Sequence, residues 1–456
     1  MDRPAALSRA LSRVLTRVLT RVLSRVLSRV LRILTVVGVL LALGGALTSA
    51  AGAGWTRAVR LAAPSSIDVL GTQTASSPGG AAAVSFNEVN LDAQATAGTF
   101  LALAGRHGGF GPARPVPGVQ EILALAYAGP TLDLLTASGP AGQPCCSTVQ
   151  IIRRGVPQTI VGGAGGGVGG GATGRLVPLA NGRMLAVVAG PQRLWVTESR
   201  SRNGRFGAAR ALTRPLVAPS ALAVTGTAGG GAGLVWTQGS GQSVIGAGAG
   251  PGATPSRPRV LLRVPAGTVI DGLQLVSRPG GLTLAWTKSY TDGAGLYHSR
   301  VYAADVRAAL TVGRVRALSG AGEVASGLSL AGDGNGDEVA AWDVCAVGST
   351  ACVVKSAVRG GRPGWFGRAR TLGAVDAGDS PQASMAPGGA SLVGWIAGGR
   401  VVLAGVRAGA SAFGAAAPLS GDLAGNLALG FGPTGAAVAT WTEGTFLTGV
   451  FAAVAR

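Results

Sequence analysis

Short apolar segments separated by turn residues recur along most of this chain. One stretch shows the pattern well: the runs IDGLQLVS, GLTLAWT, LYHSRVYAA and GRVRALS follow one another between Ile270 and Ser319, divided by Gly, Pro, Asp and Thr. Brief runs of this kind with β-branched and aromatic residues predict strands, and glycine every few residues disfavours helices. From about residue 54 onward the pattern therefore predicts an all-β chain.

The strand pattern is an internal repeat with two markers. Apolar runs that end in tryptophan contain Trp236, Trp286, Trp342, Trp395 and Trp441. A second marker, Phe-Gly-x-Ala, follows several of these runs and begins at Phe110, Phe206, Phe366 and Phe413. Both markers share a period of roughly 50 residues, and four strands per period are typical of a β-propeller. We expect the tryptophans and phenylalanines to pack between neighbouring sheets and not to form a binding site.

The number of blades follows from markers of the second strand in each repeat. These markers fall near Phe86, Leu134, Val187, Trp236, Trp286, Trp342, Trp395 and Trp441. They predict about eight four-stranded blades, with seven as the alternative because the second repeat is the least regular. The last repeat lacks a Phe-Gly-x-Ala strand, whereas the segment WTRAVRLA from Trp55 resembles one. Because an open array exposes backbone edges, we predict that Thr56–Leu61 pairs antiparallel with Thr445–Val454 and closes the ring.

The strand-Trp and Phe-Gly-x-Ala repeats resemble those of uncharacterised exported β-propeller proteins of high-GC, actinobacterial-type bacteria. The resemblance covers about residues 55–456. Its motifs are structural, so it implies an architecture and no activity.

The first 53 residues differ from the rest of the chain. Residues 1–32 are rich in arginine, residues 33–53 are uncharged, and Ala51 and Ala53 form an A-x-A pattern. A basic region, an apolar region and a small-residue cleavage site are the parts of a secretory signal peptide. We expect an N-terminal hydrophobic helix that directs export, followed by the propeller over residues 54–456. The protein would then be extracellular or at the cell surface; the alternative is an uncleaved helix that anchors it to the membrane.

Composition and charge exclude several classes. With 47% hydrophobic residues the chain can bury a core, which excludes wholesale disorder. The formal net charge of +20 suggests a nucleic-acid binder, but beyond residue 54 the arginines are scattered and not interleaved with aromatics. We therefore expect no nucleic-acid partner, contact with a membrane only through the N-terminal segment, and a monomer.

Four cysteines in an exported chain suggest disulfides. Cys345 and Cys352 flank the loop in WDVCAVGSTACVVK, between two expected neighbouring strands. Their spacing places both thiols across a hairpin, so we predict that they are bonded to each other. Cys145 and Cys146 are adjacent, and three alternatives stay open for them: a vicinal disulfide, pairing between molecules, or free thiols.

Familiar catalytic and cofactor motifs are incomplete. A G-x-G-x-x-G pattern within Gly162–Gly171 lacks the helix and the acidic residue of a dinucleotide site, so a loop between blades is the better interpretation. The segment Asp333–Glu338 resembles the start of a calcium loop, but a plain hairpin turn fits better because later ligands are missing. No serine lies in a nucleophile elbow, and there are only two histidines. We assign no catalytic, cofactor or metal residue.

Two functional hypotheses remain. The favoured one is an exported, non-catalytic propeller that binds a glycan, peptide or protein through loops on one face of the ring. The alternative is an extracellular carboxylate-dependent hydrolase or lyase. Two acids close together and facing a pocket would favour the enzyme, whereas scattered acids would favour the binding protein.

Overall fold

A computed structural model describes residues 55–455, with short gaps at 66–67, 91–94, 107–108, 140–147, 163–171, 180–181, 192, 214–218, 220, 251–254, 308, 347–350, 362–363, 377, 433 and 445–447. All regular elements in the described residues are β-strands. A membrane-spanning helix is not found among them.

Most of the strands form antiparallel sheets of four, consecutive in the chain. The first three sheets contain β2 (Asp68–Ser76), β3 (Ala82–Asn90), β4 (Ala95–Ala104) and β5 (Arg114–Pro115); β6 (Glu121–Ala128), β7 (Thr131–Ser138), β8 (Thr148–Arg153) and β9 (Val156–Val161); and β10 (Thr173–Pro178), β11 (Met184–Ala189), β12 (Leu194–Glu198) and β13 (Arg210–Ala211). The fourth contains β14 (Leu222–Gly226), β15 (Ala232–Gln238), β16 (Ser243–Ala249) and β17 (Arg259–Arg263).

An eight-stranded sheet follows. Its halves contain β18 (Thr268–Arg278), β19 (Gly281–Thr291), β20 (Tyr297–Arg307) and β21 (Arg316–Ala317), and β22 (Val324–Gly332), β23 (Glu338–Cys345), β24 (Cys352–Arg359) and β25 (Arg370–Val375). The two halves are joined by a parallel pairing at Ser299 and Val324. The remaining sheets contain β26 (Gln382–Met385), β27 (Ser391–Ala397), β28 (Arg400–Val406) and β29 (Ala417–Pro418), and β30 (Ala424–Phe431), β31 (Ala437–Glu443), β32 (Thr448–Ala455) and β1 (Val59–Ser65).

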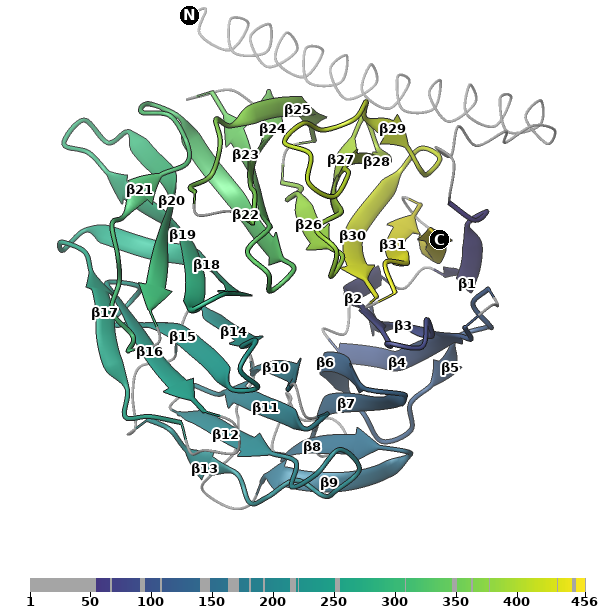
Figure 1. Cartoon of the computed structure of the whole chain (residues 1–456). Helices are drawn as coiled ribbons and strands as arrows, with labels where there is room; N and C mark the ends of the chain where they lie inside the picture. Colours follow the sequence, from purple (N-terminus) through teal and green to yellow (C-terminus); the bar gives the residue numbers. More distant parts are fainter. Residues whose placement is uncertain are drawn as a thin grey trace, which may run out of the picture. The chain divides into compact units, whose positions relative to one another are not determined.

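The sheets form a ring, as expected of a β-propeller (Figure 1). The first strand of each group of four contacts the first strand of the next, and the last of them returns to the first, through β2, β6, β10, β14, β18, β22, β26, β30 and again β2. The ring therefore has its first strands on the inside and its fourth strands at the rim.

The inner strands are locked to one another at β-bulges. Bulges interrupt the pairing of β2, β18, β22 and β30, and left-handed residues lie in them, namely Gly71, Gly272, Gly327 and Asn426. The side-chain amide of Gln73 donates to the Ile122 carbonyl of the next inner strand at 3.1 Å, and that of Gln274 to Leu328 at 3.3 Å. These bonds satisfy backbone carbonyls that the irregular strands leave unpaired.

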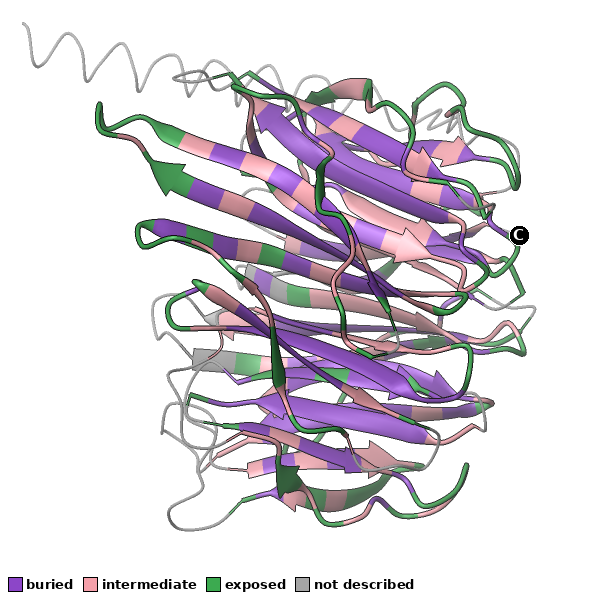
Figure 2. Ribbon diagram, turned by 60° about the vertical axis from the view of Figure 1, so that its left-hand side comes forward, coloured by how far each residue is buried: buried purple, intermediate pink, exposed green. Residues whose placement is uncertain are grey.

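The core is divided among the interfaces between neighbouring sheets. All of the predicted second-strand markers lie in second strands, from Phe86 in β3 to Trp441 in β31, so this prediction is confirmed. The five marker tryptophans are buried, and Trp236, for example, packs with Val187 and Leu185 of the preceding sheet. Figure 2 shows the buried residues along the middle strands and the exposed ones at turns and at the rim.

Half of the fourth strands are very short. β5, β13, β21 and β29 contain two residues each. In the Phe-Gly-x-Ala segments of Phe110 and Phe206 the phenylalanine forms one isolated bridge to the third strand and is buried. Burial of this ring, and not a long backbone ladder, therefore attaches much of the rim.

The ring is closed by the N-terminal strand. β1 pairs antiparallel with β32, in a register that places Val59 opposite Ala452 and Ser65 opposite Thr448. Upstream, the amide of Thr56 donates to the Val454 carbonyl at 2.8 Å. The predicted pairing is thus confirmed, although the regular strand begins and ends a few residues later than Thr56–Leu61.

Candidate functional site

Charged side chains are distributed unequally between the two faces of the ring. One face carries the connections from first to second strand and from third to fourth strand; we call it the arginine face. Its arginines include Arg106, Arg153, Arg154, Arg183, Arg200, Arg202, Arg205, Arg257, Arg259, Arg278, Arg307, Arg314, Arg359, Arg368 and Arg407. The opposite face carries most of the acids, namely Glu88, Glu121, Asp271, Asp292, Glu323, Asp343, Asp376, Asp379, Asp422 and Glu443.

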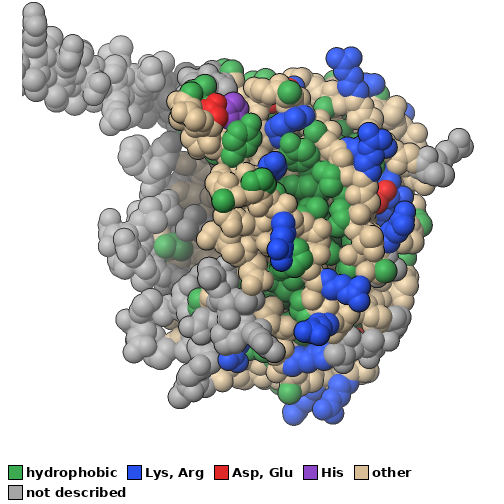
Figure 3. Space-filling view, turned by 90° about the vertical axis from the view of Figure 1, so that its left-hand side faces the viewer, with side chains coloured by type: hydrophobic (Ala, Val, Ile, Leu, Met, Phe, Trp, Pro, Cys, Tyr) green, Lys and Arg blue, Asp and Glu red, His purple; other side chains and the backbone are tan. Residues whose placement is uncertain are grey.

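The acids of the arginine face are already occupied. Asp133, Glu198, Asp305 and Glu338 form ion pairs with arginines. Asp333 accepts hydrogen bonds from the backbone amides of residues 335–337. The exposed charge of this face is therefore largely guanidinium. Figure 3, a view of the outer side of the ring, shows Lys and Arg side chains bordering an apolar strip with few acids among them.

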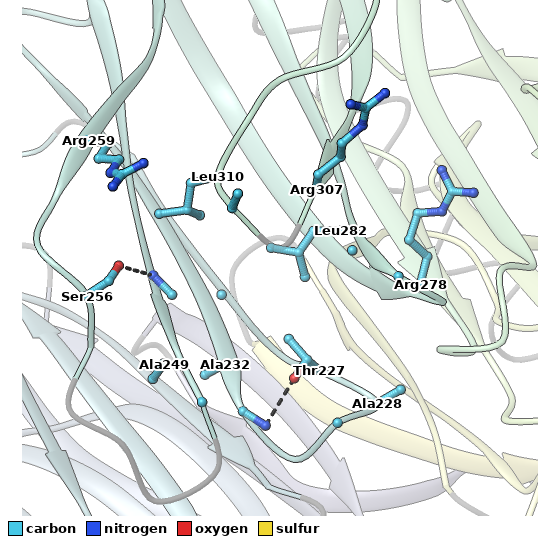
Figure 4. Close-up of a pocket in the computed structure, with 18 of the residues that line it drawn as sticks. Thr227, Ala228, Ala232, Ala249, Ser256, Arg259, Arg278, Leu282, Arg307 and Leu310 are labelled. Carbon is cyan, nitrogen blue, oxygen red and sulfur yellow. Dashed lines mark hydrogen bonds between the residues drawn. The ribbon is translucent and has the colours of Figure 1, made fainter.

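A groove of about 680 Å³ opens on the arginine face between the β14–β17 sheet and the β18–β21 half-sheet. We call it the arginine groove. It is lined by the β14–β15 and β18–β19 turns and by parts of the connections that follow β16 and β20. Leu282 and Leu310 lie between Arg259 on one side and Arg278 and Arg307 on the other (Figure 4). Four arginines and no carboxylate line the groove, the fourth being Arg257.

Three of these arginines are available to a ligand. Arg257, Arg259 and Arg307 are exposed, and within the described part of the chain their guanidinium groups form no ion pair. Arg278 differs because it is paired with Asp305. Since guanidinium groups bind carboxylate, sulfate and phosphate oxygens through paired N–H donors, the groove suits an anionic ligand.

Two glycines that line the groove are required by the close approach of neighbouring backbone. A Cβ atom on Gly231 would collide with the Ala249 carbonyl, and one on Gly281 with the Val306 carbonyl. The atoms that such a Cβ would meet belong to the backbone, and backbone cannot move aside as the end of a flexible side chain could. A side chain at either position would therefore displace the backbone beside the groove.

Two further hollows lie on the same face. One of about 780 Å³ lies between the β2–β5 and β6–β9 sheets and carries Arg114 and Arg154. Another of about 600 Å³ lies at the C-terminal ends of β2 and β6, next to the turn after β10, and is lined in part by Arg202. Neither is lined by Asp or Glu. The arginine face therefore has several anion-compatible hollows and not a single pocket.

A buried ionic network borders the arginine groove. Arg359 Nη1 lies 2.7 Å from Asp305 Oδ1 and 3.5 Å from Glu338 Oε2, and Thr283 donates to Glu338 at 2.6 Å. Burial raises the pKa of Glu338 despite the opposing effects of Thr283 and Arg359. Burial also tends to raise the pKa of Asp305, but its hydrogen bonds to Arg359 and Arg278 outweigh this and lower it. The network holds Arg278 at the edge of the groove.

The cysteine prediction is confirmed for one pair. Cys345 and Cys352 are disulfide-bonded and lie directly opposite each other in β23 and β24, with Cα atoms 4.1 Å apart. Cys145 and Cys146 lie outside the described residues, as do most of the glycines of Gly162–Gly171.

The segment Asp333–Glu338 forms a turn. Asp333 is occupied by the backbone amides of its own turn, and Glu338 points into the buried network with Arg359. Groups of three or more His, Cys, Asp or Glu side chains that could hold a metal are not found in the described residues. Of the two histidines, His298 contacts Asp292 Oδ2 at 2.7 Å, and His107 lies outside the described residues.

Two carboxylates of the opposite face are each held by a serine. Asp343 accepts a hydrogen bond from Ser326 at 2.6 Å, and Asp271 one from Ser289 at 3.5 Å. Burial raises the pKa of both, against these hydrogen bonds. Neither aspartate lines any of the three hollows described above. The arrangement of two acids facing a pocket, which would favour an enzyme, is not what these hollows present.

Comparison with known proteins identifies neighbours in fold. No family model matches the chain, and no curated protein matches it. Among solved structures it is similar to the Dos1 propeller (TM-score 0.49, 11% identity, 87% of this chain and 94% of that one). It is similar to the WD40 domain of SCAP from fission yeast (0.48, 10%, 88% and 98%) and to the polysaccharide lyase Uly1 (0.48, 10%, 74% and 90%). These likenesses concern the fold and carry no residue of the site.

Sequence reasoning missed the arginine groove. Arg257 and Arg259 are close in the chain, but whole strands separate them from Arg278 and Arg307, so no run or motif marks the set. The one available signal is positional. Arginine recurs where a strand ends at this face, as in SRPGG at Arg278, which ends a first strand, and DVRA at Arg307, which ends a third strand.

Proposed function

We propose that this protein is an exported, non-catalytic β-propeller that binds an acidic extracellular glycan through its arginine face. The observation that carries the proposal is the arginine groove, in which exposed guanidinium groups surround an opening that no carboxylate lines. Of the partners expected from the sequence (a glycan, a peptide or a protein), a polymer with repeated carboxylate or sulfate groups fits several basic hollows on one face best.

Binding of this kind is expected to depend on several weak contacts. Each exposed guanidinium–carboxylate pair contributes at most about 1 kcal/mol in water. Several pairs to one chain add through effective concentration. Because the contacts are exposed, salt should weaken them. A neutral glycan would lose these contacts, so selectivity for acidic chains follows.

Eight blades is the count that we propose for the ring. The closed cycle of inner strands supports it, since each half of the eight-stranded sheet contributes one strand, β18 or β22, to that cycle. Among the described strands, the β-ladder joins the two halves only at Ser299 and Val324, so each half counts as one blade.

Export is the second part of the proposal. The disulfide between Cys345 and Cys352 supports an oxidising compartment. Residues 33–53 would direct secretion, or anchor the protein if they are not cleaved. Sequencing the N-terminus of protein from culture supernatant tests this, and a start near Gly54 or Trp55 is expected.

The binding proposal is tested by removing charge from the groove. The variant Arg257→Ala/Arg307→Ala should lose affinity for an acidic polysaccharide such as polygalacturonate by on the order of tenfold, which corresponds to about 1.4 kcal/mol. Arg193→Ala/Arg263→Ala removes the same charge on the opposite face and should bind like the wild type. Equal losses in both variants would show that net charge alone drives binding, and binding of neutral dextran with equal affinity would also contradict the proposal.

A further inference from the structure

One arginine of the arginine face is held in a way that the others are not. Arg202 lies in the connection after β12 and reaches the hollow at the C-terminal ends of β2 and β6. Its side chain lies across two glycines from the turns of different sheets. A Cβ atom on Gly129 would lie 2.7 Å from Arg202 Cζ, and one on Gly182 would lie 2.9 Å from Arg202 Cγ.

Both glycines are also required by their own backbone. Gly129 has φ of 63° and Gly182 has φ of 75°, in the left-handed region that favours glycine. The same two residues therefore form the turns and leave the space in which the Arg202 side chain lies extended. A residue with a side chain at either position would displace the Arg202 side chain.

The loop that carries Arg202 is anchored from the neighbouring sheet. Arg153 Nη1 donates to the Arg202 carbonyl at 3.3 Å and to the Gly204 carbonyl at 2.7 Å. Arg153 is itself held by the buried carboxylate of Asp133, whose Oδ1 it contacts at 2.7 Å. Arg154 adds a bond to Asn203 at 2.9 Å. These contacts hold the backbone from which the Arg202 side chain extends, and the two glycines leave the space that the side chain occupies.

The guanidinium group at the end of this support has no acceptor among the described residues. The hollow that it enters contains about 600 Å³, and its lining is Ser76, Tyr127, prolines, small and aliphatic residues, with no carboxylate. Arg153 and Arg359 of the same face pair with acids, whereas Arg202 is exposed and has no acid partner among the described residues. An exposed guanidinium beside an acid-free hollow, on a loop whose backbone is held by Arg153 and Arg154, is available to an external anion.

We propose that Arg202 forms an oxyanion subsite at the inner edge of the arginine face, which takes one carboxylate or sulfate group through the paired N–H donors of its guanidinium. Gly129, Gly182 and Arg153 act as positioning residues. The subsite deepens the proposed function, since it would receive one acidic group of a bound glycan, but it does not require a polymer. A single small oxyanion should occupy it.

The experiment measures binding of two small anions by the purified protein. Sodium glucuronate and sodium sulfate are titrated separately at constant ionic strength, and affinity is taken from calorimetry and from the rise in melting temperature. The two arms separate a carboxylate from a sulfate as the preferred group. Arg202→Ala is compared with Arg205→Ala, which removes the same charge from the same loop, and with Arg202→Lys, which keeps the charge but loses the planar fork.

The wild type and Arg205→Ala should bind one of the anions with affinities within about twofold of each other. Arg202→Ala should lose at least about tenfold, and Arg202→Lys should lie between them. Equal affinities of the Arg202→Ala and Arg205→Ala proteins, or no binding of either anion by the wild type, would overturn the subsite.

Failure of the subsite can be told apart from failure of the proposed function. Arg257→Ala/Arg307→Ala leaves Arg202 in place, so this variant should bind the polysaccharide more weakly but keep the wild-type affinity for the small anion. If the wild type binds the small anion through Arg202 but no acidic polysaccharide, the subsite stands and the glycan proposal falls. If the polysaccharide binds and Arg202→Ala changes neither ligand, the reverse holds.

Discussion

Leu61→Ala tests whether the N-terminal strand closes the ring. Leu61 lies in β1 and is only 5% exposed, packed in a cluster with Val450, Ala452 and Phe110. Truncating a buried leucine to alanine costs about 2–5 kcal/mol through lost burial and the cavity left behind. We expect a loss of about 3 kcal/mol here, because the cluster joins the first and last sheets and gives the seam much of its apolar contact.

Val59→Ala is the matched control. Val59 lies two residues earlier in β1 and is 36% exposed, so it has the same backbone pairing but little buried surface. Its truncation should cost under about 1 kcal/mol. Both values come from urea unfolding followed by tryptophan fluorescence, which reports the buried marker tryptophans, with equal slopes required for the comparison.

Deletion of residues 55–62 extends the test. It removes the strand that covers β32 and should leave an unpaired edge, so we expect dimers or larger species in size-exclusion chromatography. If Leu61→Ala is no more costly than Val59→Ala, and the deletion stays monomeric with an unchanged melting temperature, the seam is held by other contacts. The side-chain amide of Asn426, which donates to the Val69 carbonyl at 2.9 Å, would be the first alternative.

Three further predictions concern the sheets themselves. Arg359→Met should cost about 3–5 kcal/mol by leaving buried Glu338 without its partner, and the double variant Arg359→Met/Glu338→Leu should recover most of this in urea unfolding; no recovery would mean that the arginine acts mainly by packing on Trp365. Replacing Cys345 and Cys352 together by serine should cost about 2–3 kcal/mol, since the closed loop is short, and non-reducing peptide maps that link either cysteine elsewhere would argue against the hairpin. Burial raises the pKa of Glu121, so the folded state favours its neutral carboxyl group, and the resulting stability, present at low pH, is lost as the pH rises through the raised pKa and the carboxylate forms. Glu121→Gln should therefore be more stable than the wild type at pH 7 and equal to it near pH 4 in thermal melts, and a variant that is less stable at pH 7 would contradict the assigned cause.

The repeat could be interpreted from sequence because its causes are local and recur in every copy. A second strand that is buried on both sides needs an unbroken apolar run, so Trp236, Trp286, Trp342, Trp395 and Trp441 mark the same position each time. Counting the strands of each repeat shows that the last repeat lacks an outer strand and that the segment from Trp55 can supply it. The disulfide between Cys345 and Cys352 follows from hairpin geometry, since both ends of a short loop lie on paired strands.

The inner bulges and the site could not be found in this way. Gln73 and Gln274 are ordinary polar residues in sequence, and only the placement of the next sheet gives their amides a carbonyl to bind. The arginines of the groove come from three separate connections, after β16, β18 and β20, which meet because the ring brings them to one face. Composition and spacing along the chain determined the strands and their number per repeat. Which charges share a surface, and which are neutralised by a neighbour, was decided by tertiary structure alone, because electrostatic partners depend on distance in space and not on distance in sequence.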